Sequence, residues 1–205
     1  MATAEKTVPL GDACSFQAGF AARGRLEPAN GAGRLALQLR DLTEGGGVNL
    51  AAVQRFLLPD LPQRYAVQPG DVVFRSRGAA NTAHLMPAGP AEPIFALMPL
   101  FVLRPNPAVV APEYIVWAIN HGDAQRQIDA EAQGTSLRMV SKQALEQIQI
   151  PVPDIPTQRL IVMLAALASA EADLLQQLAQ KRLTLVNQML SAAAHGGAQQ
   201  KGVRQ

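Results

Sequence analysis

The stretch Pro151-Val152-Pro153-Asp154-Ile155-Pro156-Thr157-Gln158 runs directly into a segment, Arg159 to Ala194, that contains neither Gly nor Pro, although the chain holds 16 Gly and 15 Pro. The segment is rich in Leu, Ala and Gln, which favour the helix. It predicts one uninterrupted helix over residues 155–194, roughly 50 Å long from Arg159 onward. In a chain of 205 residues, a single domain cannot cover such a helix, so we expect it to bind another segment.

Apolar residues form two neighbouring stripes on this helix, which together make a face wider than a minimal two-stranded coiled coil needs. Glu171 and Arg182 interrupt the first stripe, and Leu160 and Lys181 belong to the second. The helix could pack on its own domain, or it could pair in an antiparallel or bundle-type arrangement with a long helix of a second copy or another subunit. The residues predicted to make that pairing are Ile161, Leu164, Leu167, Leu174, Leu175, Leu178, Leu185 and Met189.

Composition limits the class of protein. No window holds 18 consecutive apolar residues, and Met1 to Pro9 has no apolar core of a signal peptide, so we expect no membrane partner and a cytoplasmic location. The single Cys14 excludes an internal disulfide and fits a reducing compartment. Cys14 has no basic neighbour in sequence, which predicts a small core residue rather than a nucleophile.

Basic residues outnumber acidic ones only slightly, but they are unevenly distributed along the chain. The net charge is only +2, and 14 of the 18 basic residues are Arg. From Arg23 to Arg77 there are eight Arg and five acidic residues. Because Arg makes bidentate contacts to phosphates and base edges, this bias favours a nucleic-acid partner more than the net charge does.

Residues 8–110 are short apolar runs separated by Gly, Pro and Asn, which is typical of strands joined by loops. After them we expect a helix from Pro112 to His121-Gly122, a second over 123–132, a short helix over 142–147 capped by Ser141, and a strand over 148–150. The fold class is therefore α+β: a mixed, strand-rich domain with short helices over 1–154, a coiled-coil-type helix over 155–194, and a disordered tail over 195–205. The strands are expected over 34–39, 71–75, 94–97 and 100–103.

The sites of common enzymes are missing from the sequence. It holds no phosphate loop and no dinucleotide-binding glycine motif, and His84, His121 and His195 have no partner at metal-ligand spacing. The triple glycine Gly45-Gly46-Gly47 fits a flexible hairpin tip better than a phosphate cradle. A binding role is therefore favoured over catalysis, with no cofactor in this chain.

Two loops carry the side chains best suited to DNA. One follows the clearest strand, Arg75-Ser76-Arg77-Gly78-Ala79-Ala80-Asn81-Thr82, and the other is Gln133-Gly134-Thr135-Ser136-Leu137-Arg138. Each could instead be an ordinary loop, a solvated hairpin end in the first case and a helix-to-strand connection in the second. Small donors beside Arg suit phosphate and base-edge contacts. The candidate contacts are Arg75, Ser76, Arg77, Asn81, Thr135, Ser136 and Arg138.

Several short motifs occur in a fixed order along the chain. They are Leu10-Gly11-Asp12, Gly19-Phe20, Pro69-Gly70-Asp71-Val72-Val73-Phe74, Pro112 to Asn120, Gly134 to Ser141, Ile148-Gln149-Ile150-Pro151-Val152-Pro153, and Gln158 at the start of the long helix. This ordered set resembles the specificity (S) subunit of type I restriction–modification systems over roughly residues 8–190. The sequence departs from the family pattern at Thr157, where Glu is usual. It also has one recognition domain and one long helix where full-length members have two of each, so it resembles a half-size form or a fragment of a full-length subunit.

The resemblance implies a function. An S subunit is not itself catalytic. Its target-recognition domains read the two halves of a split DNA site, while methyltransferase subunits carry S-adenosylmethionine and flip out the target adenine. For this chain it implies double-stranded DNA, a second copy of itself, a methyltransferase subunit and, in some systems, a nuclease subunit as partners. The alternative is an adaptor or inhibitory module that has kept the scaffold and no longer reads DNA.

Overall fold

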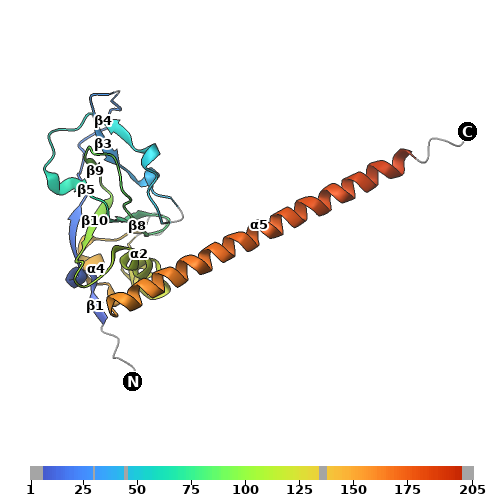
Figure 1. The fold of residues 1–205 in the computed structure, drawn as a ribbon. Coiled ribbons are helices and arrows are strands. Elements are labelled where there is room, and N and C mark those ends of the chain that lie inside the picture. Colours follow the sequence, from blue (N-terminus) through green and yellow to red (C-terminus); the bar gives the residue numbers. More distant parts are fainter. Residues whose placement is uncertain (1–6, 30, 44–45, 134–137, 200–205) are drawn as a thin grey trace, which may run out of the picture. The chain divides into compact units, whose positions relative to one another are not determined.

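A computed structural model describes residues 7–29, 31–43, 46–133 and 138–199. The chain divides into a globular unit that extends to Val162 and a second unit that begins at Met163 (Figure 1). The second unit is the greater part of one helix, α5 (Ile155–Gln199). The first two turns of α5 therefore belong to the globular unit.

Two four-stranded sheets and a set of short helices form three layers of the globular unit (Figure 1). The first sheet is antiparallel, in the order β2 (Cys14–Ala18), β10 (Leu100–Pro105), β6 (Val72–Arg75) and β8 (Ala83–Leu85). The second has the order β4 (Gln54–Phe56), β3 (Arg34–Leu37), β9 (Ile94–Ala96) and β5 (Ala66–Val67), with β3 and β9 parallel. The helical layer contains α1 (Leu10–Ala13), α2 (Pro112–Asn120), α3 (Gly122–Glu131) and α4 (Lys142–Gln147).

The first sheet is the middle layer, because its strands alternate between two cores. Val72 and Phe74 of β6 face the core shared with the helices, while Val73 faces the core shared with the second sheet. Phe101 and Leu103 of β10 likewise face the helices, and Leu100 and Val102 face the other way. A strand buried on both faces carries a continuous apolar run, which is why β6 and β10 are the clearest strands in the sequence.

Most expected elements are confirmed. Strands form within or close to all four expected ranges, α2 and α3 adjoin at His121, and Ser141 caps α4 by accepting a hydrogen bond from Ala144 N at 3.1 Å. The pair β1 (Thr7–Pro9) and β12 (Gln149–Pro151) joins the two ends of the globular unit. The 3₁₀ turns η1 (Leu39–Asp41), η2 (Leu50–Ala52) and η3 (Gln63–Tyr65) complete the connections.

Two of the sequence motifs set turns and crossings. Gly70 has φ +86°, a conformation that only Gly adopts readily, and it turns the chain into β6. Gly19 lies at a crossing where a Cβ would stand 2.6 Å from the carbonyl carbon of Leu97 and 2.9 Å from Leu100 O. Cys14 is buried, as expected, and its burial raises the pKa of the thiol to about 12.

The start of α5 is fixed by two polar side chains. Asp154 Oδ1 accepts a hydrogen bond from Thr157 N at 2.9 Å, and hydrogen bonds from Thr157 lower the pKa of the Asp154 carboxyl. Gln158 is completely buried. Its Oε1 accepts from Ala111 N at 2.8 Å, and its Nε2 donates to Val109 O at 3.0 Å and Pro153 O at 2.8 Å. Gln158 therefore ties the helix to the turn before α2.

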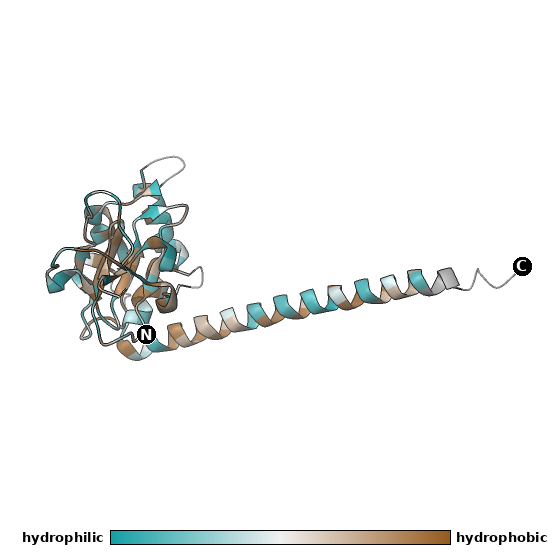
Figure 2. Cartoon of the chain, turned by 90° about the horizontal axis from the view of Figure 1, so that it is seen from above, coloured by the Kyte–Doolittle hydropathy of each residue, from teal (hydrophilic) through white to brown (hydrophobic). Residues whose placement is uncertain are grey.

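The remainder of α5 is amphipathic (Figure 2). The predicted pairing residues from Leu164 onward are all exposed, and Met163, Leu183, Val186 and Leu190 are exposed beside them. Ile161 is different from the prediction, because it is half-buried and packs against the core of the globular unit. The helix continues past the expected end at 194 to Gln199, and residues 200–205 lie outside the described part of the chain. By length and composition alone, α5 could cross a membrane.

Candidate nucleic-acid interface

The two predicted DNA-contacting loops, far apart in the sequence, meet in one two-stranded ribbon. Strand β7 (Arg77–Gly78) pairs antiparallel with β11 (Arg138–Met139), with Arg138 opposite Gly78 and Met139 opposite Arg77. Beside the ribbon, Val140 N donates to Ser76 O at 2.9 Å, and Gln133 and Met139 exchange two backbone hydrogen bonds. Between Gln133 and Arg138 the chain runs through residues 134–137, which include the candidates Thr135 and Ser136 and lie outside the described residues.

Arg77 is the most available cation of the ribbon. Its side chain is exposed, and it makes no hydrogen bond or ion pair with the described part of the chain. Gly78, the next residue, has φ +146°, which a residue with a Cβ rarely adopts. Arg138 is already neutralised, because its guanidinium lies 2.7 Å from Asp129 Oδ1 and also donates to Asp129 O at 2.8 Å. A phosphate would have to displace Asp129 to bind Arg138, whereas at Arg77 it would displace no ion-pair partner among the described residues.

Ser76 and Asn81 have a different role from the predicted one. Both are buried. Ser76 Oγ donates to Pro99 O at 2.6 Å, and Asn81 Nδ2 donates to Arg75 O at 3.1 Å. These bonds close the end of the β6–β8 hairpin and fix the position of β7, so the two side chains support the ribbon from within. The alternation of Ser76 with Arg75 and Arg77 in the sequence is the signal that could have assigned Ser76 to the inner face, whereas alternation gives no such signal for Asn81.

Arg75 is only half-buried and reaches η1, where it donates to Leu39 O at 3.3 Å. Its buried Nε has no hydrogen-bond partner among the described residues. Alternation in the sequence predicts that Arg75 and Arg77 lie on the same side, but in the structure only Arg77 is exposed and Arg75 is half-buried. Arg75 is therefore a weaker candidate contact than Arg77.

Sequence reasoning treated His84 as isolated, yet it fixes a third loop beside this hairpin. His84 Nδ1 lies 3.2 Å from Gly47 O, and its Nε2 lies 2.9 Å from Thr82 Oγ1. Because a carbonyl can only accept, Nδ1 carries the proton and Nε2 accepts from Thr82. Burial is the main cause that lowers the pKa of His84, so the ring is neutral. The loop that contains Gly47 is thereby held on β8, the strand that follows the ribbon loop.

Two amides on the helical layer complete the support. Asn120, at the end of α2, accepts from Ala83 N and donates to Ala83 O, both at 2.8 Å. Gln125 on α3 donates to Asn81 O at 3.0 Å. These bonds satisfy the outer edge of β8, which would otherwise be an unpaired sheet edge. The hairpin that carries Arg77 is thus held rigidly on both sides.

The basic bias of residues 23–77 is partly neutralised within the domain. Arg34 pairs with Asp60 at 2.6 Å, and Arg55 pairs with Glu92. Arg23 and Arg25 are exposed and have no ion pair with the described residues, and they line an open depression of about 470 Å³ together with Phe20 and Leu57. The cations left for a polyanion are therefore fewer than the sequence suggests.

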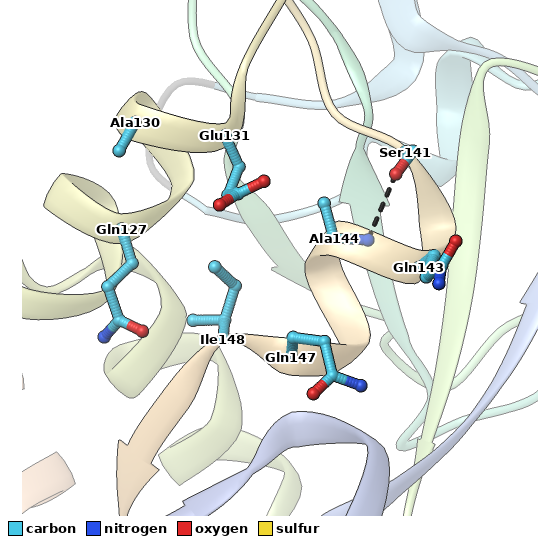
Figure 3. Close-up of a pocket in the computed structure, with 8 residues that line it drawn as sticks. All are labelled: Gln127, Ala130, Glu131, Ser141, Gln143, Ala144, Gln147 and Ile148. Carbon is cyan, nitrogen blue, oxygen red and sulfur yellow. Dashed lines mark hydrogen bonds between the residues drawn. The ribbon is translucent and has the colours of Figure 1, made fainter.

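A second depression, also of about 470 Å³, lies between α3 and α4 (Figure 3). Gln127 on one wall binds both backbone groups of Gln149, with its Oε1 2.8 Å from Gln149 N and its Nε2 3.0 Å from Gln149 O. Glu131 is the single carboxylate among the lining residues. Within the described residues, no cluster of three or more His, Cys, Asp or Glu could hold a metal ion.

Comparison with known proteins identifies the fold. No protein-family model and no curated protein matches the chain. The crystal structure of the HsdS subunit from Thermoanaerobacter tengcongensis is similar, with a TM-score of 0.61 and 16% identity over 84% of this chain and 39% of that one. A chain from a structure on complex assembly and conformational transition of the type I R-M system has a TM-score of 0.63 and 18% identity, over 84% of this chain and 40% of that one.

These matches show that the chain has the fold of type I restriction–modification specificity subunits, a strand-rich domain followed by a long helix. The α+β class and the resemblance expected from the ordered motifs are confirmed at the level of the fold. The chain spans less than half the length of the similar chains.

Proposed function

We propose that this chain is a non-catalytic, sequence-specific DNA-recognition subunit that dimerises through α5 and directs methyltransferase subunits to a bipartite DNA site. The β7–β11 ribbon carries this proposal. It carries Arg77, which is exposed and has no ion pair within the described residues, on a hairpin held by buried hydrogen bonds. Two such domains related by a two-fold axis would read inverted half-sites. S-adenosylmethionine would bind to the methyltransferase, and a nuclease subunit could join the same assembly.

The direct test is DNA methylation by the chain together with its methyltransferase subunit, mapped over a genome, and compared between the parent and R77A. If Arg77 reads a base, R77A relaxes one position of the site, with a loss of about 1–3 kcal/mol of discrimination. If it contacts a phosphate, R77A weakens binding to all sequences and reduces the slope of log K against log salt by about one. R126A is the matched control, because Arg126 is exposed on α3 and paired with Asp123.

The alternative, an adaptor or inhibitor that no longer reads DNA, rests on the low net charge and on the internal pairing of Arg138. It predicts that the parent binds the methyltransferase without any salt-dependent shift of duplex DNA and without site-specific methylation. That result would replace the proposed function. Equal methylation by R77A and the parent would instead leave the DNA role and remove Arg77 from it.

Dimerisation has its own test. Replacing Leu175 and Leu178 together by Asp would bury unpaired carboxylates in the helix pair, so we expect monomers in light scattering. The globular unit should keep its stability, since both residues are exposed on the single chain. A parent chain that stays monomeric at micromolar concentration, even with its methyltransferase, would contradict the dimer.

A further inference from the structure

Two opposite charges lie in the middle of the apolar face of α5. At about 100° per residue, Arg182 follows Leu164 by five full turns, and Glu171 points within about 20° of the same direction. Both side chains are exposed, and neither makes an ion pair or hydrogen bond within the described residues. The two charges therefore do not stabilise the single helix. Charges inside an apolar face weaken helix pairing unless each one pairs with an opposite charge. Asp173, by contrast, lies half a turn away, on the polar face with Gln177 and Gln180.

The charges are placed symmetrically. The midpoint between Glu171 and Arg182 falls between Gln176 and Gln177. Met163 and Leu190, the outermost exposed large apolar residues of the second unit, are equidistant from the same point. Two copies of α5 laid antiparallel about a two-fold axis at this midpoint therefore bring Glu171 beside Arg182 of the partner subunit, twice. They also bring Leu164 opposite Met189 and Leu175 opposite Leu178 of the partner subunit.

We infer that Glu171 and Arg182 form two reciprocal ion pairs across an antiparallel dimer of α5, and that these pairs select a single register. The inference rests on the proposed dimerisation and adds its geometry. A slip of seven residues in either direction would set Glu171 opposite Leu175 or Met189, and Arg182 opposite Leu164 or Leu178, of the partner subunit. Each slipped register leaves charges unpaired against apolar residues. A parallel, in-register pair would set Glu171 beside Glu171 of the partner subunit, and Arg182 beside its own copy.

The register sets a length. In the paired helices, Val162 of one subunit and Val162 of the partner subunit are separated by about 43 Å along the axis, at the helical rise per residue. A slip of seven residues changes this separation by about 10 Å, which is about three base-pair steps of DNA. The partner that fits this face is a second copy of the chain, since a second copy supplies both complementary charges at the required spacing. The two ion pairs therefore fix the spacing between the globular units.

The test is charge exchange, measured by sedimentation equilibrium. The variant E171R has two basic groups on the face and R182E has two acidic ones, so each should self-associate at least about tenfold more weakly than the parent. An equimolar mixture of E171R and R182E restores both pairs and should form a mixed dimer with about the parental affinity. The double variant E171R/R182E should also dimerise like the parent. D173R is the control, since it reverses a charge on the opposite face and should leave the affinity unchanged.

Cross-linking reads the register directly. Chains carrying L164C and chains carrying M189C should form a disulfide when mixed, because these positions lie opposite each other in the inferred register, whereas L164C mixed with L178C should not. The buried Cys14 does not compete. Parental self-association of E171R and R182E, or the second cross-link in place of the first, would overturn the register while the proposed dimer stands. A monomeric parent, or one that partitions into phosphatidylcholine vesicles instead of dimerising, would overturn the dimer itself.

Discussion

Gln158 offers the sharpest test of how the long helix is joined to the globular unit. Q158A removes three side-chain hydrogen bonds and leaves Ala111 N, Val109 O and Pro153 O without these partners. At about 1 kcal/mol for each bond, we expect the free energy of unfolding to fall by about 3 kcal/mol. For a unit of this size, that corresponds to a melting temperature lower by about 6–12 °C.

Urea unfolding measured by the fluorescence of Trp117 provides the assay, because Trp117 is the single tryptophan and lies in α2 beside the same turn. Q176A is the matched control. Gln176 is exposed on α5, so its loss should change the free energy by no more than about 0.5 kcal/mol. Q158E keeps the acceptor toward Ala111 but presents no donor to the two carbonyls, so it should also be destabilised at neutral pH. If Q158A were as stable as Q176A, the proposed anchoring of α5 would be wrong.

Three further outcomes are expected. G19A should cost about 1–3 kcal/mol in urea unfolding, because its Cβ would meet the Leu97 backbone at 2.6 Å, whereas G89A, with its nearest contact at 3.6 Å, should be nearly neutral. Insertion of four residues after Gln176 lengthens the spacer by about 6 Å, nearly two base-pair steps, so mapped methylation should show a wider gap between unchanged half-sites; altered half-sites with an unchanged gap would refute the spacer role. Burial lowers the pKa of His84 below 6.5, so the unfolded chain binds a proton that the folded chain resists. The free energy of unfolding of the parent, measured in urea, should therefore be lower at pH 5.5 than at pH 7.5. This decrease should be smaller for H84N, and it should equal that of the parent for the exposed-residue control H195N.

Local patterns in the sequence determined the secondary structure. The absence of Gly and Pro after Arg159 predicts α5, Ser141 predicts the cap of α4, and the apolar runs within β6 and β10 predict strands. Each of these features depends on residues that are near neighbours in the chain, where propensity, capping and periodicity act directly. The residue types of the two loops that meet in the ribbon also made both of them candidates for DNA contacts, which stays a prediction.

Only the tertiary structure decided which of these elements contact each other and which side chains face the interior of the domain. The pairing of β7 with β11 joins segments that are distant in the sequence, and no local pattern encodes that contact. Whether a polar side chain faces DNA or a carbonyl of its own domain depends on where the chain returns. Ser76 donates a hydrogen bond to Pro99 and Arg138 pairs with Asp129, while Arg77 has no such partner among the described residues. Ile161 follows the same rule: its spacing matches the pairing stripe, but the folded core lies beside it, and burial there takes it out of the free face of the helix.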